Sequence, residues 1–289
     1  MKLISILISF SAIICQAQTS SLKESLTVNS KILGHDVKYS IYLPAGYEQS
    51  DRNYPVLYLL HGYTDDDTGW VQFGEVQKIS DKAISKDKTT PMIIVMPDAG
   101  VSWYINSRDK KVMYEDFFIQ EFIPYIDKTY KTRSKKEFRA VAGLSMGGHG
   151  TLIYALKHPD LFSAAAPLSA GVLTEKELID MNEDNWNRVW APPFGKDLTG
   201  NKRLGEHMKQ NWAISLINNT DSEALKKVKY YIDCGDDDFL IKGNTAIHEA
   251  LIDKKVPHEF RVRDGGHSWE YWRTALPEVL KFVSESFHR

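Results

Sequence analysis

The sequence has little cysteine, little excess charge and no residue spacing typical of a metal site. Cys15 and Cys234 are the two cysteines among 289 residues, so the fold cannot depend on a framework of disulfides. The formal net charge is −2 at pH 7, without a basic stripe or polybasic tail, which argues against binding of nucleic acid or a membrane by charge. The acidic run 65–67 lacks the spacing of a calcium loop, and no His/Cys cluster has zinc spacing. We therefore expect neither a metal nor a cofactor.

The N-terminal apolar run is too short to be expected to span a membrane. It covers residues 3–14 after Lys2, fewer than the roughly 20 residues that a span needs. Ala17 provides a small residue for signal peptidase, so residues 1–17 are predicted to be a secretory signal. The protein is then exported to the periplasm or the medium, with no membrane insertion after cleavage. A lipid anchor at Cys15 is the alternative, which the bulky residue before this cysteine disfavours.

The rest of the chain, residues 18–289, is predicted to form a single α/β domain. Hydrophobic residues make up 43% of the sequence, enough for one large core, and neither a linker nor an internal repeat divides it. Strand-like runs alternate with helical ones, which indicates a doubly wound, mainly parallel sheet with helices on both faces. Two alternating segments, 23–30 and 36–43, are predicted to be antiparallel edge strands. The buried strands are predicted at 54–60, 92–96, 138–142, 164–168 and 230–234.

A serine between glycines follows one of these strands. Residues 143–147 read Gly-Leu-Ser-Met-Gly, after the apolar run 138–142 and before a helical pattern. The spacing G-x-S-x-G at a strand-to-helix turn is typical of a serine nucleophile. The sharp turn strains the serine backbone, and side chains on the flanking residues would block both the turn and the substrate. Ser145 is therefore the predicted nucleophile.

A carboxylate and a histidine follow this serine in the chain order of a doubly wound hydrolase. One buried strand ends in a turn glycine and three acids, Asp236 to Asp238. Asp238 is the predicted acid because it lies furthest past the glycine, and the other two are interpreted as helix-capping or solvated turn residues. His267 is the predicted base, since it alone combines this chain order with a glycine-rich loop after a strand. A structural or surface role is expected for the histidines at 149, 158 and 248.

Two backbone N–H groups are expected to form an oxyanion hole for the tetrahedral intermediate. Met146 directly follows the nucleophile, and Tyr63 follows an early strand that runs into His61 and Gly62; donors come from these two places in such folds. His61 lies upstream of the serine, which is the wrong order for the base. We interpret it as a residue that shapes the oxyanion turn.

Together these stretches resemble the esterase D-like branch of the α/β-hydrolases, which includes the feruloyl and acetyl xylan esterases of carbohydrate esterase family 1, tributyrin esterases and S-formylglutathione hydrolases. From about residue 35 onward the matching stretches are LLHGYTDDDTGW, VMPDAGVSWY, GLSMGGHGTLIYALKHPDLFSAAAPLSA, DCGDDDFL and GGHSWEYW. The resemblance implies an α/β-hydrolase fold. Carried over position by position, the family's triad and oxyanion donors fall on Ser145, Asp238, His267, Tyr63 and Met146. Residues 173–216 depart most from the family pattern, where the substrate-binding cap varies, so the acyl group stays open.

Tryptophans in predicted loops offer flat apolar faces for a sugar ring or a phenolic acyl group. Trp70 follows the oxyanion loop, Trp103 follows a strand end and Trp269 flanks the predicted base. Such loops meet at the carboxyl edge of the sheet, where hydrolase sites assemble. We predict that these three residues bind substrate in an open aromatic cleft, with core packing as the alternative. Trp272, on the last helix, is expected in the core.

The predicted activity is that of an exported serine carboxylic ester hydrolase. It removes feruloyl or acetyl groups from xylan fragments through an acyl-enzyme, so its predicted partner is a small-molecule or oligosaccharide ester. A general short-chain esterase of the tributyrin type is one alternative. A thioesterase similar to S-formylglutathione hydrolase is another, disfavoured because that substrate belongs to the cytosol. An acyltransferase or a non-catalytic carbohydrate-binding relative is the alternative of another class; an intact triad argues against the latter. The oligomeric state stays open.

Overall fold

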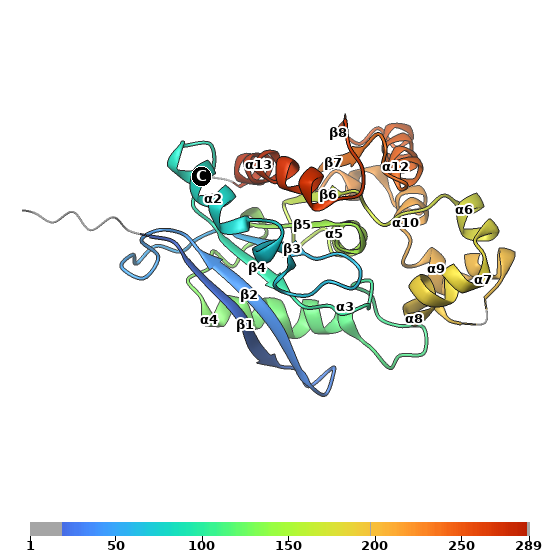
Figure 1. The fold of residues 1–289 in the computed structure, drawn as a ribbon, viewed down its shortest axis with the longest axis horizontal. Coiled ribbons are helices and arrows are strands. Elements are labelled where there is room, and N and C mark those ends of the chain that lie inside the picture. Colours follow the sequence, from blue (N-terminus) through green and yellow to red (C-terminus); the bar gives the residue numbers. More distant parts are fainter. Residues whose placement is uncertain (1–18, 197, 288–289) are drawn as a thin grey trace, which may run out of the picture.

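The computed structural model describes residues 19–196 and 198–287. The predicted secretory signal and Cys15 lie outside these residues. Within them, eight strands form one sheet in the order β1-β2-β4-β3-β5-β6-β7-β8 (Figure 1). The strands are β1 (Ser21–Asn29), β2 (Asp36–Leu43), β3 (Val56–Leu60), β4 (Ile93–Pro97), β5 (Arg139–Leu144), β6 (Ala164–Leu168), β7 (Lys229–Gly235) and β8 (His258–Arg263). Strand β2 is antiparallel to β1 and β4, and the other neighbours are parallel.

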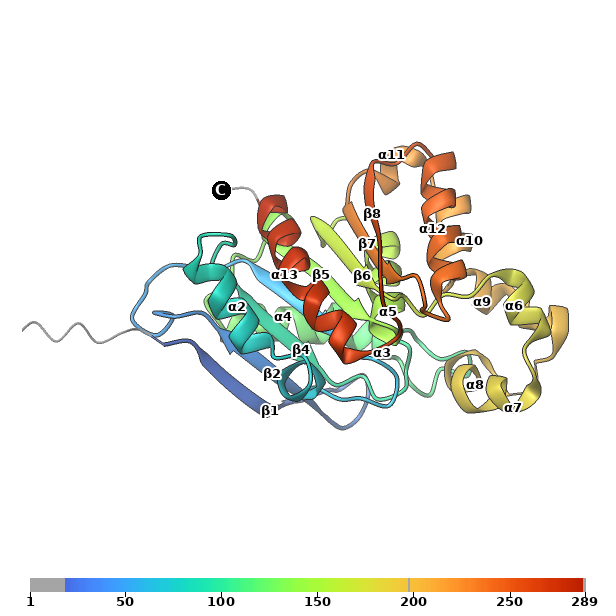
Figure 2. The same cartoon turned by 45° about the horizontal axis from the view of Figure 1, so that its top comes forward.

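Helices cover both faces of the sheet. The helices outside the segment between β6 and β7 are α1 (Gly69–Gln72), α2 (Val76–Ser85), α3 (Tyr114–Asp116), the π-helical turn η1 (Phe117–Phe122), α4 (Ile123–Thr129), the 3-10 turn η2 (Lys136–Phe138), α5 (Met146–Lys157), α12 (Ile241–Asp253) and α13 (Trp269–Ser286). Helices α2 and α13 pack side by side on one face (Figures 1 and 2). Helices α4, α5 and α12 share the core of the other face.

Strand β3 illustrates how the sequence builds these two layers. Side chains of a strand alternate between the faces of a sheet. Val56, Tyr58 and Leu60 accordingly lie in the core shared with α5, whereas Leu57 and Leu59 lie in the core shared with α13. Because both faces are covered, all five residues are buried and the strand is apolar throughout. The predicted α/β fold class, a doubly wound and mainly parallel sheet, is confirmed.

The predicted strands all form, with boundaries that differ by at most two residues. The strand predicted from residue 54 begins at Val56, because Tyr54 instead forms an isolated bridge with Thr132. Segment 36–43 is a strand as predicted, but it is not an edge strand. It lies between β1 and β4, so β1 is the antiparallel edge of the sheet.

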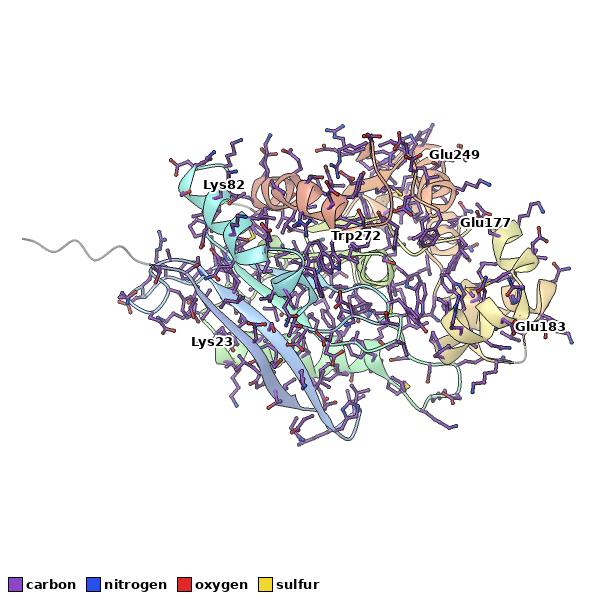
Figure 3. All side chains as sticks on the ribbon, in the orientation of Figure 1. Lys23, Lys82, Glu177, Glu183, Glu249 and Trp272 are labelled. Carbon is purple, nitrogen blue, oxygen red and sulfur yellow. The ribbon has the colours of Figure 1, made fainter. Side chains whose placement is uncertain are left out.

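Residues 173–196 and 198–216 form a helical cap beyond the carboxyl ends of the strands. The elements between β6 and β7 are α6 (Glu175–Asp180), α7 (Glu183–Asn185), the π-helical turn η3 (Trp186–Trp190), α8 (Ala191–Phe194), the 3-10 turn η4 (Gly200–Leu204), α9 (Glu206–Lys209), α10 (Ala213–Asn219) and α11 (Ser222–Leu225). Figure 2 shows α6 to α9 projecting from one end of the sheet, and Figure 3 labels Glu177 and Glu183 on this projection. Among the described helices, none is long and apolar enough to cross a membrane.

Candidate active site

Ser145 occupies the sharp turn between β5 and α5. Its backbone angles, φ 54° and ψ −115°, lie in a region that non-glycine residues rarely adopt. Two hydrogen bonds fix this conformation: the Ser145 N–H donates to the carbonyl of Leu168 at 2.9 Å, and the Gly171 N–H donates to the carbonyl of Ser145 at 2.7 Å. The turn therefore projects the Ser145 side chain at the carboxyl end of the sheet.

The two flanking glycines are required by close backbone contacts. A Cβ atom on Gly147 would lie 2.5 Å from the carbonyl oxygen of Leu60 and 2.6 Å from that of His61. A Cβ atom on Gly143 would lie 2.6 Å from the carbonyl oxygen of Gly147. Real Cβ atoms do not approach backbone this closely, so only glycine lets the turn pack against the end of β3.

His267 links Ser145 to Asp238. Its Nε2 lies 3.0 Å from Ser145 Oγ, and its Nδ1 lies 2.9 Å from Asp238 Oδ2. The other oxygen of Asp238 accepts the N–H of Leu240 at 2.9 Å. Burial raises the pKa of Asp238, but hydrogen bonding and charge attraction to His267 outweigh it and hold this pKa below its usual value. The ionised carboxylate accepts the Nδ1 proton, which leaves the Nε2 lone pair directed at the serine hydroxyl.

The loop that carries His267 is anchored at both ends by one buried carboxylate. Asp233, on β7, is fully buried and accepts two hydrogen bonds from Arg263 at 3.0 and 3.1 Å. It also accepts the phenol O–H of Tyr271, at the start of α13. Arg263 precedes the loop and Tyr271 follows it, so the Asp233 carboxylate holds both ends of the His267 loop.

Among the described residues, Asp238 is the acid that bonds to His267, and neither Asp236 nor Asp237 forms a hydrogen bond with it. Both are exposed, and with Asp264 they bring carboxylate oxygens within 4.8 Å of one another on the surface. Asp236 accepts the N–H of Gly265 at 3.1 Å. Asp236 thus stabilises the turn through its side chain and Asp237 through its backbone N–H, which donates to the carbonyl of Gly265 at 3.1 Å, while Asp238 faces the histidine.

Met146 and Tyr63, the predicted oxyanion donors, both lie beside Ser145. Met146 begins α5, and Tyr63 follows Gly62, where a Cβ atom would lie 3.7 Å from Ser145 Cβ. Within residues 19–196 and 198–287, neither N–H donates a hydrogen bond to a protein acceptor. Tyr63 and Ser145 line the same cavity.

His61 holds the loop that carries Tyr63. Its side chain is buried, its Nε2 accepts the N–H of Ala99 at 2.8 Å, and its Nδ1 donates to the carbonyl of Gly62 at 2.7 Å. Tyr104 adds a hydrogen bond from its phenol to the His61 carbonyl at 3.1 Å. These contacts agree with the interpretation of His61 as a residue that shapes this turn.

A cavity of about 550 Å³ opens beside Ser145 and His267. This volume suits a small organic ligand. Its wall is mostly apolar and combines residues of the sheet edge with residues of the cap. The lining residues are Gly62, Tyr63, Asp65, Trp103, Leu144, Ser145, Gly171, Leu173, Met181, Asn185, Arg188, Val189, Trp190, Phe239, Leu240, His267, Trp269 and Trp272.

Two of the three tryptophans predicted to bind substrate line the cavity, and the third does not. Trp103 and Trp269 line the cavity, but Trp70 does not: its side chain is 1% exposed and its indole N–H donates to the carbonyl of Leu60 at 2.9 Å. The prediction that Trp70 binds substrate is therefore wrong, because core packing and this hydrogen bond direct its ring inward. Trp272, expected in the core, is only 5% exposed yet also lines the cavity, near the middle of the molecule in Figure 3.

Two further aromatic residues of the wall, Phe239 and Trp190, were not among the predicted substrate-binding residues. Trp190, in the cap, stacks on Trp103 with ring centroids 3.8 Å apart. Phe239 packs its ring 4.7 Å from that of His267 and is 68% exposed. An apolar residue directly after Asp238 was the available signal for Phe239, whereas Trp190 is brought in by the folding of the cap.

Two hydrogen bonds hold the cap over this cavity. The phenol of Tyr63 donates to the carbonyl of Arg188 at 2.6 Å, and the indole N–H of Trp103 donates to the carbonyl of Val189 at 2.9 Å. Both carbonyls belong to the π-helical turn η3, a type of turn frequent at functional sites. The cap is therefore attached to the two loops that flank the serine.

The sheet and the serine turn identify the fold as that of an α/β-hydrolase, and comparison with known proteins identifies the family. Residues 30–283 match the Esterase family, described as "Putative esterase", and the chain belongs to this family. A solved ferulic acid esterase is 34% identical, with a TM-score of 0.80 over 94% of this chain and 100% of that one. The predicted resemblance is confirmed, and the chain is a carboxylic ester hydrolase.

Two curated relatives carry names that specify an activity. An acetyl esterase of Caldicellulosiruptor saccharolyticus is 24% identical over 236 residues, which cover 81% of this chain and 85% of that protein. An endo-1,4-beta-xylanase/feruloyl esterase of Xylanibacter ruminicola is 35% identical over 164 residues, 54% of this chain. That match takes in 23% of the Xylanibacter protein, so the similarity concerns only part of it.

Proposed function

We propose that the chain is a serine esterase that releases feruloyl or acetyl groups from plant polysaccharide fragments such as xylan. The observation that carries the proposal is the pair of hydrogen bonds from Asp238 through His267 to Ser145, in the wall of an aromatic cavity. The names of the ferulic acid esterase, the acetyl esterase and the xylanase/feruloyl esterase support these acyl groups.

In the proposed acylation, Ser145 Oγ attacks the ester carbonyl carbon while His267 Nε2 takes the hydroxyl proton. The carbonyl π electrons move onto its oxygen, which accepts the N–H groups of Met146 and Tyr63. When the tetrahedral intermediate collapses, the bond to the alcohol oxygen breaks and His267 donates its proton to that oxygen. Asp238 stabilises the imidazolium that exists between the two transfers.

In the proposed deacylation, water attacks the acyl-enzyme. His267 removes a proton from the water and returns one to Ser145 Oγ as the acid leaves. The net reaction consumes one ester and one water and releases one acid and one alcohol. It needs only the side chains and the two backbone donors described above.

The aromatic lining of the cavity supports a phenolic acyl group. Trp190 of the cap stacks on Trp103, and both line the cavity together with Leu173 and Val189. Flat aromatic walls gain more contact from a phenolic acyl group than from an acetyl group. We therefore place feruloyl ahead of acetyl and of short aliphatic chains.

A substrate series tests this function. The purified enzyme is assayed with methyl ferulate, 4-nitrophenyl acetate, 4-nitrophenyl butyrate and S-formylglutathione, with water as the sole acceptor and Ser145→Ala as the matched control. We expect the highest kcat/KM for the feruloyl ester and no turnover by the control. A preference for butyrate indicates a general short-chain esterase, and turnover that requires an added alcohol acceptor indicates an acyltransferase; either result contradicts the proposal.

Export is the second part of the proposed function. It rests on the signal-like sequence of residues 1–17, and the mature protein would then be the single domain that begins at residue 18. The intact mass of protein secreted from a bacterial host tests this. A chain that keeps residues 1–17, or one that carries a lipid on Cys15, contradicts the proposed cleavage.

A further inference from the structure

A continuous row of aromatic rings extends from His267 in two directions. On one side the ring of Phe239 lies 4.7 Å from that of His267. On the other, Trp272 lies 4.8 Å from His267, Trp269 lies 5.4 Å from Trp272, and Phe73 lies 5.9 Å from Trp269. The row therefore links the cavity wall to a residue outside it, Phe73.

The two ends of this row are exposed and its middle is buried. Trp272 is 5% exposed, whereas Phe73 is 51% and Phe239 is 68% exposed. Phe73 directly follows α1, and its carbonyl accepts a hydrogen bond from Arg273 of α13 at 2.8 Å. Its ring is thus held against Trp269 with an open face. Exposed aromatic side chains that adjoin a cavity are typical of an interaction site.

The chemistry of the proposed reaction determines which part of the ester meets this row. His267 Nε2 must deliver its proton to the leaving alcohol oxygen, so the alcohol lies on the His267 side of the scissile bond. The acyl group is then placed in the part of the cavity lined by Trp103 and Trp190. The alcohol portion is directed along the rings that adjoin His267.

We propose that Phe73, Trp269 and Phe239 form a subsite for the alcohol portion of the ester, and that its occupant is a saccharide. The inference rests on the proposed esterase function. Aromatic faces open to water bind the C–H faces of sugar rings, while polar side chains beside them bind hydroxyls. Such polar groups are present: the half-buried carboxylate of Asp65 lines the cavity, and the guanidinium of Arg273 adjoins Phe73. The long apolar chain of a lipid alcohol would contact these charged groups, so the subsite suits a saccharide better.

Two substrates with the same acyl group and different alcohols test the subsite. The ratio of kcat/KM for a feruloylated xylo-oligosaccharide to kcat/KM for methyl ferulate is measured in the wild type and in Phe73→Ala. We expect Phe73→Ala to lower this ratio about 10-fold, mainly through KM for the saccharide ester, and Phe73→Tyr to restore it because the ring is kept. Ile252→Ala, another exposed apolar residue, removes a side chain of α12 away from the row and should leave the ratio unchanged.

The outcomes separate the subsite from the esterase function. An unchanged ratio in Phe73→Ala overturns the subsite. A wild type that hydrolyses neither feruloyl ester contradicts the proposed function instead. Unfolding curves of Phe73→Ala and Phe73→Tyr that coincide with the wild type assign the change to binding.

Discussion

Replacement of Asp238 by Asn should lower kcat about 10⁴-fold, the scale of the same change in a serine protease triad. Both carboxylate oxygens are engaged, one by the Leu240 N–H and one by His267 Nδ1, each at 2.9 Å, and the side chain is fully buried. If the Asn oxygen stays with Leu240, the amide NH₂ faces Nδ1, which must then accept. The imidazole proton moves to Nε2, which can no longer accept the proton of Ser145. A 10⁴-fold loss corresponds to about 5.5 kcal/mol in the barrier.

The matched control is Asp237→Asn, because among the described residues Asp237 is an exposed neighbour that forms no hydrogen bond with His267. Steady-state kcat with methyl ferulate is measured for both variants, and thermal unfolding shows that each is folded. We expect the control to lose less than about threefold, since it changes only a surface charge. Equal losses in Asp236→Asn, Asp237→Asn and Asp238→Asn would refute the reasoning, because the loop conformation and not one carboxylate would then matter.

Three further predictions follow from buried groups and from the cap. Burial lowers the pKa of His149 to about 4, below the value of about 6.5 in an unfolded chain, so the unfolded state binds this proton first. The free energy of unfolding should therefore fall by up to about 3 kcal/mol as pH decreases from about 6.5 to about 4. Urea unfolding across this range should show a smaller fall in His149→Gln than in the wild type. An equal fall in both proteins contradicts the assignment to His149. Tyr63→Phe removes the hydrogen bond to the Arg188 carbonyl, which is worth about 1 kcal/mol. This variant should raise KM for methyl ferulate about fivefold, and KM for 4-nitrophenyl acetate by less. An equal rise for both substrates means that the phenol does not position the cap. Burial raises the pKa of the fully buried Cys234 thiol, so a thiol reagent should modify the Cys234 peptide only after unfolding, and rapid labelling of the native protein would contradict its burial.

The fold was predictable because its signals are local. Runs of apolar residues bounded by turn residues predict buried strands, and the strand at 164–168 has the predicted bounds. The glycines around Ser145 are also a local signal, since each is required by a contact that no larger residue allows. The order of the strands was not predictable in this way, because β4 lies between β2 and β3 through contacts far apart in the chain.

The wall of the site was predictable only in part, because it depends on how the loops and the cap pack. Trp70 and Trp103 follow similar loops, yet α1 turns the Trp70 ring into the core while Trp103 faces the cavity. Trp190 reaches the cavity through the π-helical turn η3, whose hydrogen-bonding pattern has no simple sequence signal. The roles of Ser145 and its partners stay predictions, as does the division into residues 1–17 and 18–289.

Direct detection of an acyl-enzyme on Ser145 tests the central claim. Wild-type enzyme is mixed with 4-nitrophenyl acetate, quenched in acid within the first turnover and digested for peptide mass spectrometry. We predict one acetyl group on the tryptic peptide of residues 140–157, located at Ser145, and none at this position in Ser145→Ala, which should also lose nearly all turnover. Rapid hydrolysis of the ester by Ser145→Ala, or an acetyl group that forms on another residue at the rate of turnover, would contradict the account.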